Sequence, residues 1–91
     1  MKVNIGDIIG VGCQVQPGPF SEERVVTIET VHGPISGFVR ETELKQIRDK
    51  EWMVRAEVRA IHGDELEVLI RGSFFTTNGV ASVPMRLAMA A

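Results

Sequence analysis

The sequence predicts an all-β fold: a small, partly closed barrel of about six short strands with one or two short helical segments. Three observations lead to this prediction. Apolar and polar residues alternate with a period of two along much of the chain, which is the pattern of half-buried strands. Turn sequences rich in Gly and Pro separate these segments at short intervals. The 91 residues, 44% of them hydrophobic, can close only one core, so we expect a single domain over residues 1–91.

Three strands are expected in the first half. Residues 9–15 alternate apolar side chains with Gly and Gln, and the Pro-Gly-Pro sequence at 17–19 ends this strand because proline cannot donate to a sheet. Residues 25–31 are rich in β-branched side chains, which favour a second strand. The turn at 32–34 leads into a third strand over 35–39, which closes a hairpin.

The middle of the chain predicts one helix and the clearest hairpin. Glu41 to Lys50 is polar with helix formers, and Leu44 and Ile47 would give a short helix one apolar edge over a barrel end. Residues 54–60 and 66–70 alternate as strands on either side of a His-Gly-Asp turn.

The C-terminal part predicts a short strand over 80–83 after a Thr-Asn-Gly turn, followed by an apolar tail. Pro84 to Ala91 carries only Arg86 as a charged residue, so we expect a helical turn that plugs the barrel or packs against a partner. Residues 5–47 and 52–90 show a similar order of strands and helical segment. The sequence therefore suggests two similar halves, in which Ile9 would correspond to Val54 and Gly18 to Gly63.

The charge balance is close to neutral, with ten basic and twelve acidic residues and a net charge of −2. A generic nucleic-acid-binding surface usually shows a basic surplus, so the total argues weakly against one. It leaves room for a local basic face, because six of the ten basic residues lie between Arg40 and Arg59, among five acids. A solvated, salt-bridged face is the plainer interpretation of that window. One cysteine, no signal-peptide pattern and no apolar run of about 20 residues lead us to expect a cytoplasmic protein.

Catalytic and metal-binding residues are not evident. His32 and His62 each precede a glycine in an expected surface turn, and Cys13 is expected on an apolar strand face, where a thiol is unreactive. One cysteine and two distant histidines make a poor metal site. The sequence has no glycine-rich phosphate loop opening a helix. We therefore expect a binding protein that is not an enzyme and uses no cofactor or metal.

Part of the chain resembles a known family. Residues 5–9 (Ile-Gly-Asp-Ile-Ile) and residues 37–44 (Gly-Phe-Val-Arg-Glu-Thr-Glu-Leu) are similar to the opening strand and to the strand and short helix of S1-type OB-fold barrels. The resemblance covers residues 5–71 and implies binding of single-stranded RNA by aromatic and basic residues. The matching positions here are Phe38 and Arg40, with Phe20 placed nearby. The rival interpretation is a pseudo-symmetric SH3-like or cradle-loop barrel, which accounts better for the twenty residues after Arg71.

Two functions from different classes remain open. The first is a module that binds RNA or single-stranded nucleic acid through aromatic and basic side chains: Phe20, Phe38, Arg40, Arg55 and Arg59. The second is a protein-interaction or assembly module, such as a homodimer. It would use a loop in which only one of two adjacent phenylalanines can face the core, and the apolar tail: Arg71, Phe74, Phe75, Met85, Leu87 and Met89.

Overall fold

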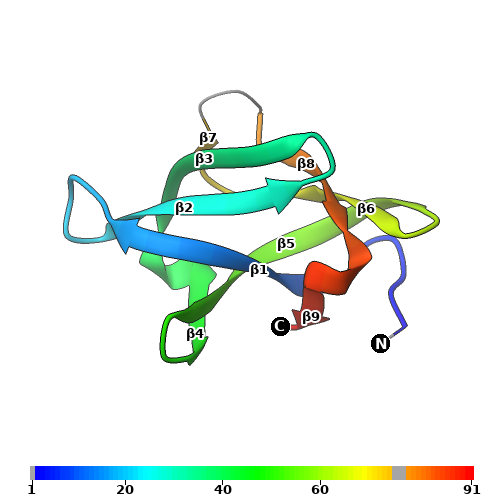
Figure 1. The fold of residues 1–91 in the computed structure, drawn as a ribbon, viewed down its shortest axis with the longest axis horizontal. Helices are drawn as coiled ribbons and strands as arrows, with labels where there is room; N and C mark the ends of the chain where they lie inside the picture. Colours follow the sequence, from blue (N-terminus) through cyan, green and yellow to red (C-terminus); the bar gives the residue numbers. More distant parts are fainter. Residues whose placement is uncertain (1, 75–77) are drawn as a thin grey trace.

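The computed structural model describes residues 2–74 and 78–91, which form one strongly curled sheet of nine strands (Figure 1). The strands are β1 (Ile8–Pro17), β2 (Glu23–Thr30), β3 (Gly33–Arg40), β4 (Leu44–Arg48), β5 (Glu51–His62), β6 (Glu65–Leu69), β7 (Ser73–Phe74), β8 (Val80–Pro84) and β9 (Ala88–Ala90). Two 3-10 turns, η1 (Glu41–Glu43) and η2 (Met85–Leu87), precede β4 and β9. The main path through the sheet runs β7-β3-β2-β1-β5-β6-β8, with β4 added to β5 and β9 to β1. The predicted all-β, barrel-like class is confirmed.

The core lies inside the curl and is built from the alternating strand residues. In the antiparallel β1–β5 pair, Ile9 lies opposite Ala56 and Val11 opposite Val54. All four side chains are buried and belong to one cluster with residues of β2, β3, β6, β7 and β8. Since successive strand residues point to opposite faces, the residues between them face outward. This alternation places the polar side chains of β5 on the outer surface.

Tight turns join the strands of the two main hairpins. The β5–β6 turn has Gly63 at φ +61°, as the first central residue of a type II′ turn requires. The β2–β3 hairpin turns at Val31 and His32. The backbone N–H of Val31 donates to the carbonyl oxygen of Ser82 in β8 at 2.9 Å. This hydrogen bond joins the β2–β3 turn to β8, the strand at the opposite end of the path, and brings the curled sheet close to a barrel.

The last strand of each half of the chain pairs with the first strand of the other half. Strand β4 pairs with β5, where Leu44 lies opposite Val54, and strand β9 pairs with β1, where Ala88 lies opposite Val11. Val11 and Val54 are themselves opposite each other, so these contacts repeat about the centre of the β1–β5 pair. Figure 1 shows β4 and β9 on the same side of the molecule, below β1 and β5.

The turns before β4 and β9 are held in the same way. The N–H of Glu41 donates to the carbonyl oxygen of Glu22 at 3.0 Å, and the N–H of Met85 donates to that of Asp64 at 2.7 Å. In both cases the first residue of a 3-10 turn forms a hydrogen bond with a residue in the connection between the first two strands of its own half. The strand pairing thus relates the two halves, with Val11 matched to Val54 rather than Ile9 to Val54.

The predicted helices and the number of strands are wrong. Within residues 2–74 and 78–91 there is no α-helix; Glu41–Lys50 forms η1, the edge strand β4 and a hairpin turn, and Pro84–Ala91 contains η2 and β9. The reason is tertiary: the edges of β5 and β1 offer backbone partners that two short, weakly helical segments satisfy by extending. The tail therefore lies along β1 and does not plug the barrel, with Leu87 packed against the rim of the core. No helix in the described part of the chain is long and apolar enough to cross a membrane.

Candidate functional site

Three adjoining hollows on the outer surface share Glu43 as a lining residue, and we call them together the arginine groove. Their volumes are about 500, 440 and 110 Å³. Three arginines from separate parts of the chain line them: Arg40, Arg55 and Arg71. The largest is within the size range of small-ligand sites. It is lined by Glu23, Phe38, Arg40, Thr42, Glu43, Arg71, Gly72 and Ser73.

The sheet places each arginine on the outside. Arg55 lies between buried Val54 and Ala56 on β5, so the strand alternation turns it outward. Arg40 is the last residue of β3, next to buried Val39, and Arg71 follows β6 after buried Ile70. The curl of the sheet then brings these three residues to one groove, although they lie 15 and 16 positions apart in the sequence (55 − 40 and 71 − 55).

The groove carries positive charge that the protein itself neutralises only in part. Arg71 Nη1 lies 4.0 Å from Glu43 Oε1, and the side chain of Arg71 is 87% exposed while that of Glu43 is 18% exposed. Arg40 and Arg55 form no ion pair or hydrogen bond through their side chains with any residue in the described part of the chain. Their guanidinium groups are therefore available for an anionic ligand.

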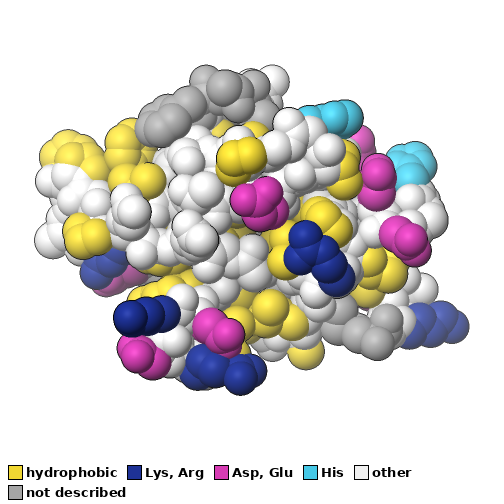
Figure 2. All heavy atoms as spheres, viewed as in Figure 1, with side chains coloured by type: hydrophobic (Ala, Val, Ile, Leu, Met, Phe, Trp, Pro, Cys, Tyr) yellow, Lys and Arg dark blue, Asp and Glu magenta, His cyan; other side chains and the backbone are white. Residues whose placement is uncertain are grey.

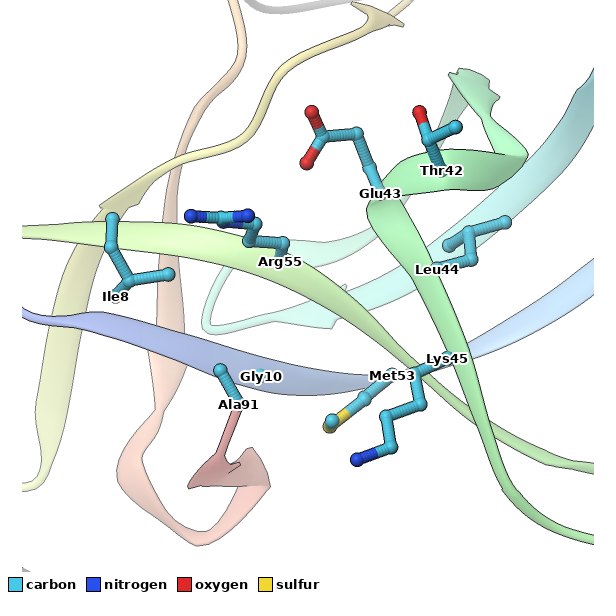
Figure 3. Close-up of a pocket in the computed structure, with 9 residues that line it drawn as sticks. All are labelled: Ile8, Gly10, Thr42, Glu43, Leu44, Lys45, Met53, Arg55 and Ala91. Atoms are coloured by element: carbon cyan, nitrogen blue, oxygen red, sulfur yellow. The ribbon is translucent and has the colours of Figure 1, made fainter.

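The close-up in Figure 3 shows how η1 and β5 divide this surface. The Glu43 carboxylate and the Thr42 hydroxyl point to the same side of η1, and the guanidinium of Arg55 extends along β5 toward Ile8 on that side. Lys45 and Met53 lie next to each other on the other side of the ribbon. Each side of the ribbon thus carries a charged side chain next to an apolar one: Arg55 near Ile8, and Lys45 next to Met53.

An aromatic side chain and a closely packed strand form the other wall. Phe38 is half-buried and lies opposite Ser73 in the β3–β7 pair. Its neighbour Gly37 is buried, and a Cβ there would be 2.6 Å from the Ser73 carbonyl oxygen. Only glycine allows this close approach, which sets Ser73 and Gly72 beside Phe38.

Most of the residues expected to bind nucleic acid are brought together. Phe38 and Arg40 line the largest hollow, and Arg55 lines the two that adjoin it. Two others lie elsewhere. Arg59 is outside all three hollows, with its Nε 4.0 Å from Glu57 Oε2, and Phe20 is 69% exposed in the loop between β1 and β2.

The residues expected to bind a protein partner are dispersed. Arg71 belongs to the arginine groove, Phe74 is 9% exposed in the core, and Phe75 lies outside the described residues. The structure therefore does not expose Phe74 for a partner, because β7 turns that side chain inward. The tail residues have different surroundings: Met85 and Leu87 pack against the core, and Met89 lies over Gly10 and Gly12.

Glu43, Thr42 and Ser73 are groove residues that the sequence did not indicate. The sequence pattern predicts a helix over 41–50, but residues 41–43 form the 3-10 turn η1, and this turn places Thr42 and Glu43 at the groove. Ser73 is placed by the pairing of β7 with β3, a contact between residues 35 positions apart (73 − 38).

Within residues 2–74 and 78–91, the remaining reactive groups are not gathered at a second site. Cys13 is partly buried against the core, and burial raises the pKa of its thiol from 9.0 to about 12. Among the described residues no three His, Cys, Asp or Glu side chains are grouped so that they could hold a metal ion. Figure 2 shows basic and acidic side chains interspersed with apolar ones on the face drawn.

Comparison with protein-family models, curated proteins and solved structures found no match to this chain.

Proposed function

We propose that this chain is a non-enzymatic module that binds single-stranded nucleic acid, RNA in particular, in the arginine groove. The observation that carries the proposal is the convergence of Arg40, Arg55 and Arg71 on one groove that Phe38 also lines. Arginine binds phosphate in a bidentate manner, and an aromatic ring stacks on an unpaired base. The resemblance of residues 5–71 to S1-type barrels supports the same class of ligand.

The shape of the groove favours a flexible strand over a duplex. Its three hollows share Glu43 and are lined by residues of β3, η1 and β5, so a flexible strand can reach more than one of them. A half-buried Phe38 can stack only on a base that is already unpaired. The acids Glu23, Glu43 and Glu57 also line the groove and reduce its positive electrostatic potential. We therefore expect a modest affinity for nucleic acid that depends on individual contacts with the arginines rather than on the total charge.

The test is titration of a fluorescein-labelled twelve-nucleotide uridine RNA, followed by fluorescence anisotropy at several salt concentrations. Three phosphate contacts predict a slope of about −2 for log K against log salt, since each contributes roughly −0.7 for single strands. Changing Arg40, Arg55 or Arg71 to Ala should weaken binding about three- to tenfold and reduce the slope by about 0.7, as expected for loss of one charged contact. A thymidine DNA of equal length measures whether the ribose hydroxyls contribute.

Arg59→Ala is the matched control. Arg59 faces outward from the same strand as Arg55 and lies outside the groove, so this variant should keep the affinity and the salt slope of the unchanged protein. No binding at low salt would refute the proposal. Equal losses for Arg55→Ala and Arg59→Ala would refute the groove as the site.

The second candidate is self-association through the outer face of β9 and β1. It is favoured by one observation: Met89 covers Gly10 and Gly12 beside Ile8, which is 43% exposed, and β9 is an uncharged edge strand. Met89→Lys places a charge on this face without removing the core contacts of Leu87. If the face associates, light scattering should show a larger mass for the unchanged protein and the monomer mass for Met89→Lys; a monomer in both would exclude it.

A further inference from the structure

The carboxylate of Glu43 is unfavourable for the binding of a nucleic acid in the arginine groove. Its side chain is 18% exposed, it lines all three hollows, and only one ion pair, to Arg71 at 4.0 Å, is made to it in the described part of the chain. A phosphate brought to Arg40 or Arg55 would approach a carboxylate as well. A ligand that fills the largest hollow must therefore offer this carboxylate hydrogen-bond donors, since covering it unpaired is unfavourable.

The unpaired bases differ in what they offer. Guanine presents two adjacent donors, N1–H and the 2-amino group, which match the two oxygens of a carboxylate. Adenine presents an acceptor, N1, beside its 6-amino group, and cytosine likewise presents N3 beside its 4-amino group. Uracil presents one N–H between two carbonyl oxygens. Only guanine meets the carboxylate with two donors and no acceptor that would face it.

We infer that the arginine groove selects guanine, with Glu43 as the residue that determines the base. This inference rests on the proposed function and adds the identity of the base to it. In this arrangement the guanine occupies the hollow of about 500 Å³ beside Phe38, and its N1–H and 2-amino group donate to the Glu43 carboxylate. Arg71 lies beside the carboxylate, and its remaining guanidinium N–H groups, together with Arg40 and Arg55, bind the neighbouring phosphates.

Four labelled RNAs test the inference on the unchanged protein. Each is a twelve-nucleotide uridine strand whose central residue is guanosine, adenosine, cytidine or inosine. We expect guanosine to bind about tenfold more tightly than adenosine, as a bidentate base contact does. Inosine keeps N1–H and lacks the 2-amino group, so its affinity should fall between the two. This series needs no variant and does not depend on whether a variant folds.

Two variants then assign the effect to Glu43. Glu43→Gln replaces one acceptor oxygen by a donor amide, so the preference for guanosine over adenosine should fall below about twofold. Glu57→Gln changes another acid of the same groove, which faces Arg59, and should keep the tenfold preference. Far-ultraviolet circular dichroism and urea unfolding check that both variants fold.

The outcomes separate the two proposals. Equal affinity for guanosine and adenosine in the unchanged protein overturns the inference and leaves nucleic-acid binding standing. A guanosine preference that survives in folded Glu43→Gln, or that is lost equally in Glu57→Gln, overturns the role of Glu43. Failure of all four RNAs to bind at low salt overturns the proposed function itself.

Discussion

Replacing Gly37 by alanine should loosen the wall of the groove that β7 forms. Gly37 is buried in β3, and its backbone is in the ordinary extended region rather than at positive φ, so alanine is allowed there conformationally. The obstacle is space. The new Cβ would be 2.6 Å from the Ser73 carbonyl oxygen, 2.7 Å from the Phe74 Cα and 2.8 Å from the Phe74 Cδ1. Two of these three atoms are backbone, so β7 itself must move.

The loss of unfolding free energy depends on which of two ways the structure accommodates the new Cβ. If β3 and β7 separate by a few tenths of an ångström, the strain is that of an overpacked core, about 1–3 kcal/mol, offset by roughly 0.4–1 kcal/mol because alanine restricts the unfolded chain. If β7 detaches, Phe74 leaves the core, and the loss is the burial free energy of one phenylalanine, about 1.5–3 kcal/mol. After the offset, the first route lowers the free energy of unfolding by about 0–2.6 kcal/mol and the second by about 0.5–2.6 kcal/mol, so we expect a loss of roughly 1–2 kcal/mol.

Urea unfolding followed by far-ultraviolet circular dichroism measures this change, with the m-value as the check on two-state behaviour. Gly12→Ala is the matched control, because its Cβ would meet nothing nearer than the Met89 Cε at 3.6 Å. We expect Gly12→Ala to be neutral or slightly stabilising. An unfolding midpoint of Gly37→Ala equal to that of the unchanged protein would refute the steric argument, as would equal losses for the two variants.

Three further predictions follow from burial, titration and backbone conformation. Ile28→Ala should lower the free energy of unfolding by about 2–5 kcal/mol, whereas Phe20→Ser should change it by less than about 0.5 kcal/mol; equal urea midpoints would contradict this. Because the pKa of the Cys13 thiol is raised from 9.0 to about 12, the unfolded chain loses this proton first. Stability should therefore fall as pH rises from 9 toward 12, more steeply than in Cys13→Val, and parallel urea midpoints at pH 8, 10 and 11 would contradict it. Gly63→Val should lose about 1–2 kcal/mol at its φ of +61° while Gly63→Asn loses less, measured by thermal unfolding; the reverse order would exclude the turn geometry as the cause.

The sequence predicted the strands whose apolar residues alternate. The expected strands over 9–15, 25–31, 35–39 and 54–60 fall within or largely within β1, β2, β3 and β5. In these strands one face is buried, so the alternation is imposed by the core and is visible without the structure. The same pattern correctly predicted that the side chain of Arg55 points outward.

The edge strands and the groove could not be predicted in the same way. Four of the five β4 residues are exposed, so that strand has no buried face to impose a period of two, and its Leu, Lys, Gln and Arg residues favour a helix by propensity. Pairing with β5 decides its conformation instead. The groove depends on the same pairing, because η1 positions Glu43 only once β4 is in place beside Val54.

The exchange of last strands between the two halves also affects how the chain folds. Neither half can complete its own sheet, because β1 needs β9 from the end of the chain and β5 needs β4 from the middle. The β4–β5 pair is a local hairpin, but the β1–β9 and β1–β5 pairs join residues far apart in the sequence, such as Ile9 with Ala90 and Val11 with Val54. Contacts of long sequence separation form slowly, so the two halves should fold as one cooperative unit. Their only covalent link is the hairpin at Asp49 and Lys50, where Lys50 has φ 63°. The two halves are thus connected in the chain by a single exposed turn, and the rest of their association depends on hydrogen bonds between strands and on the shared core.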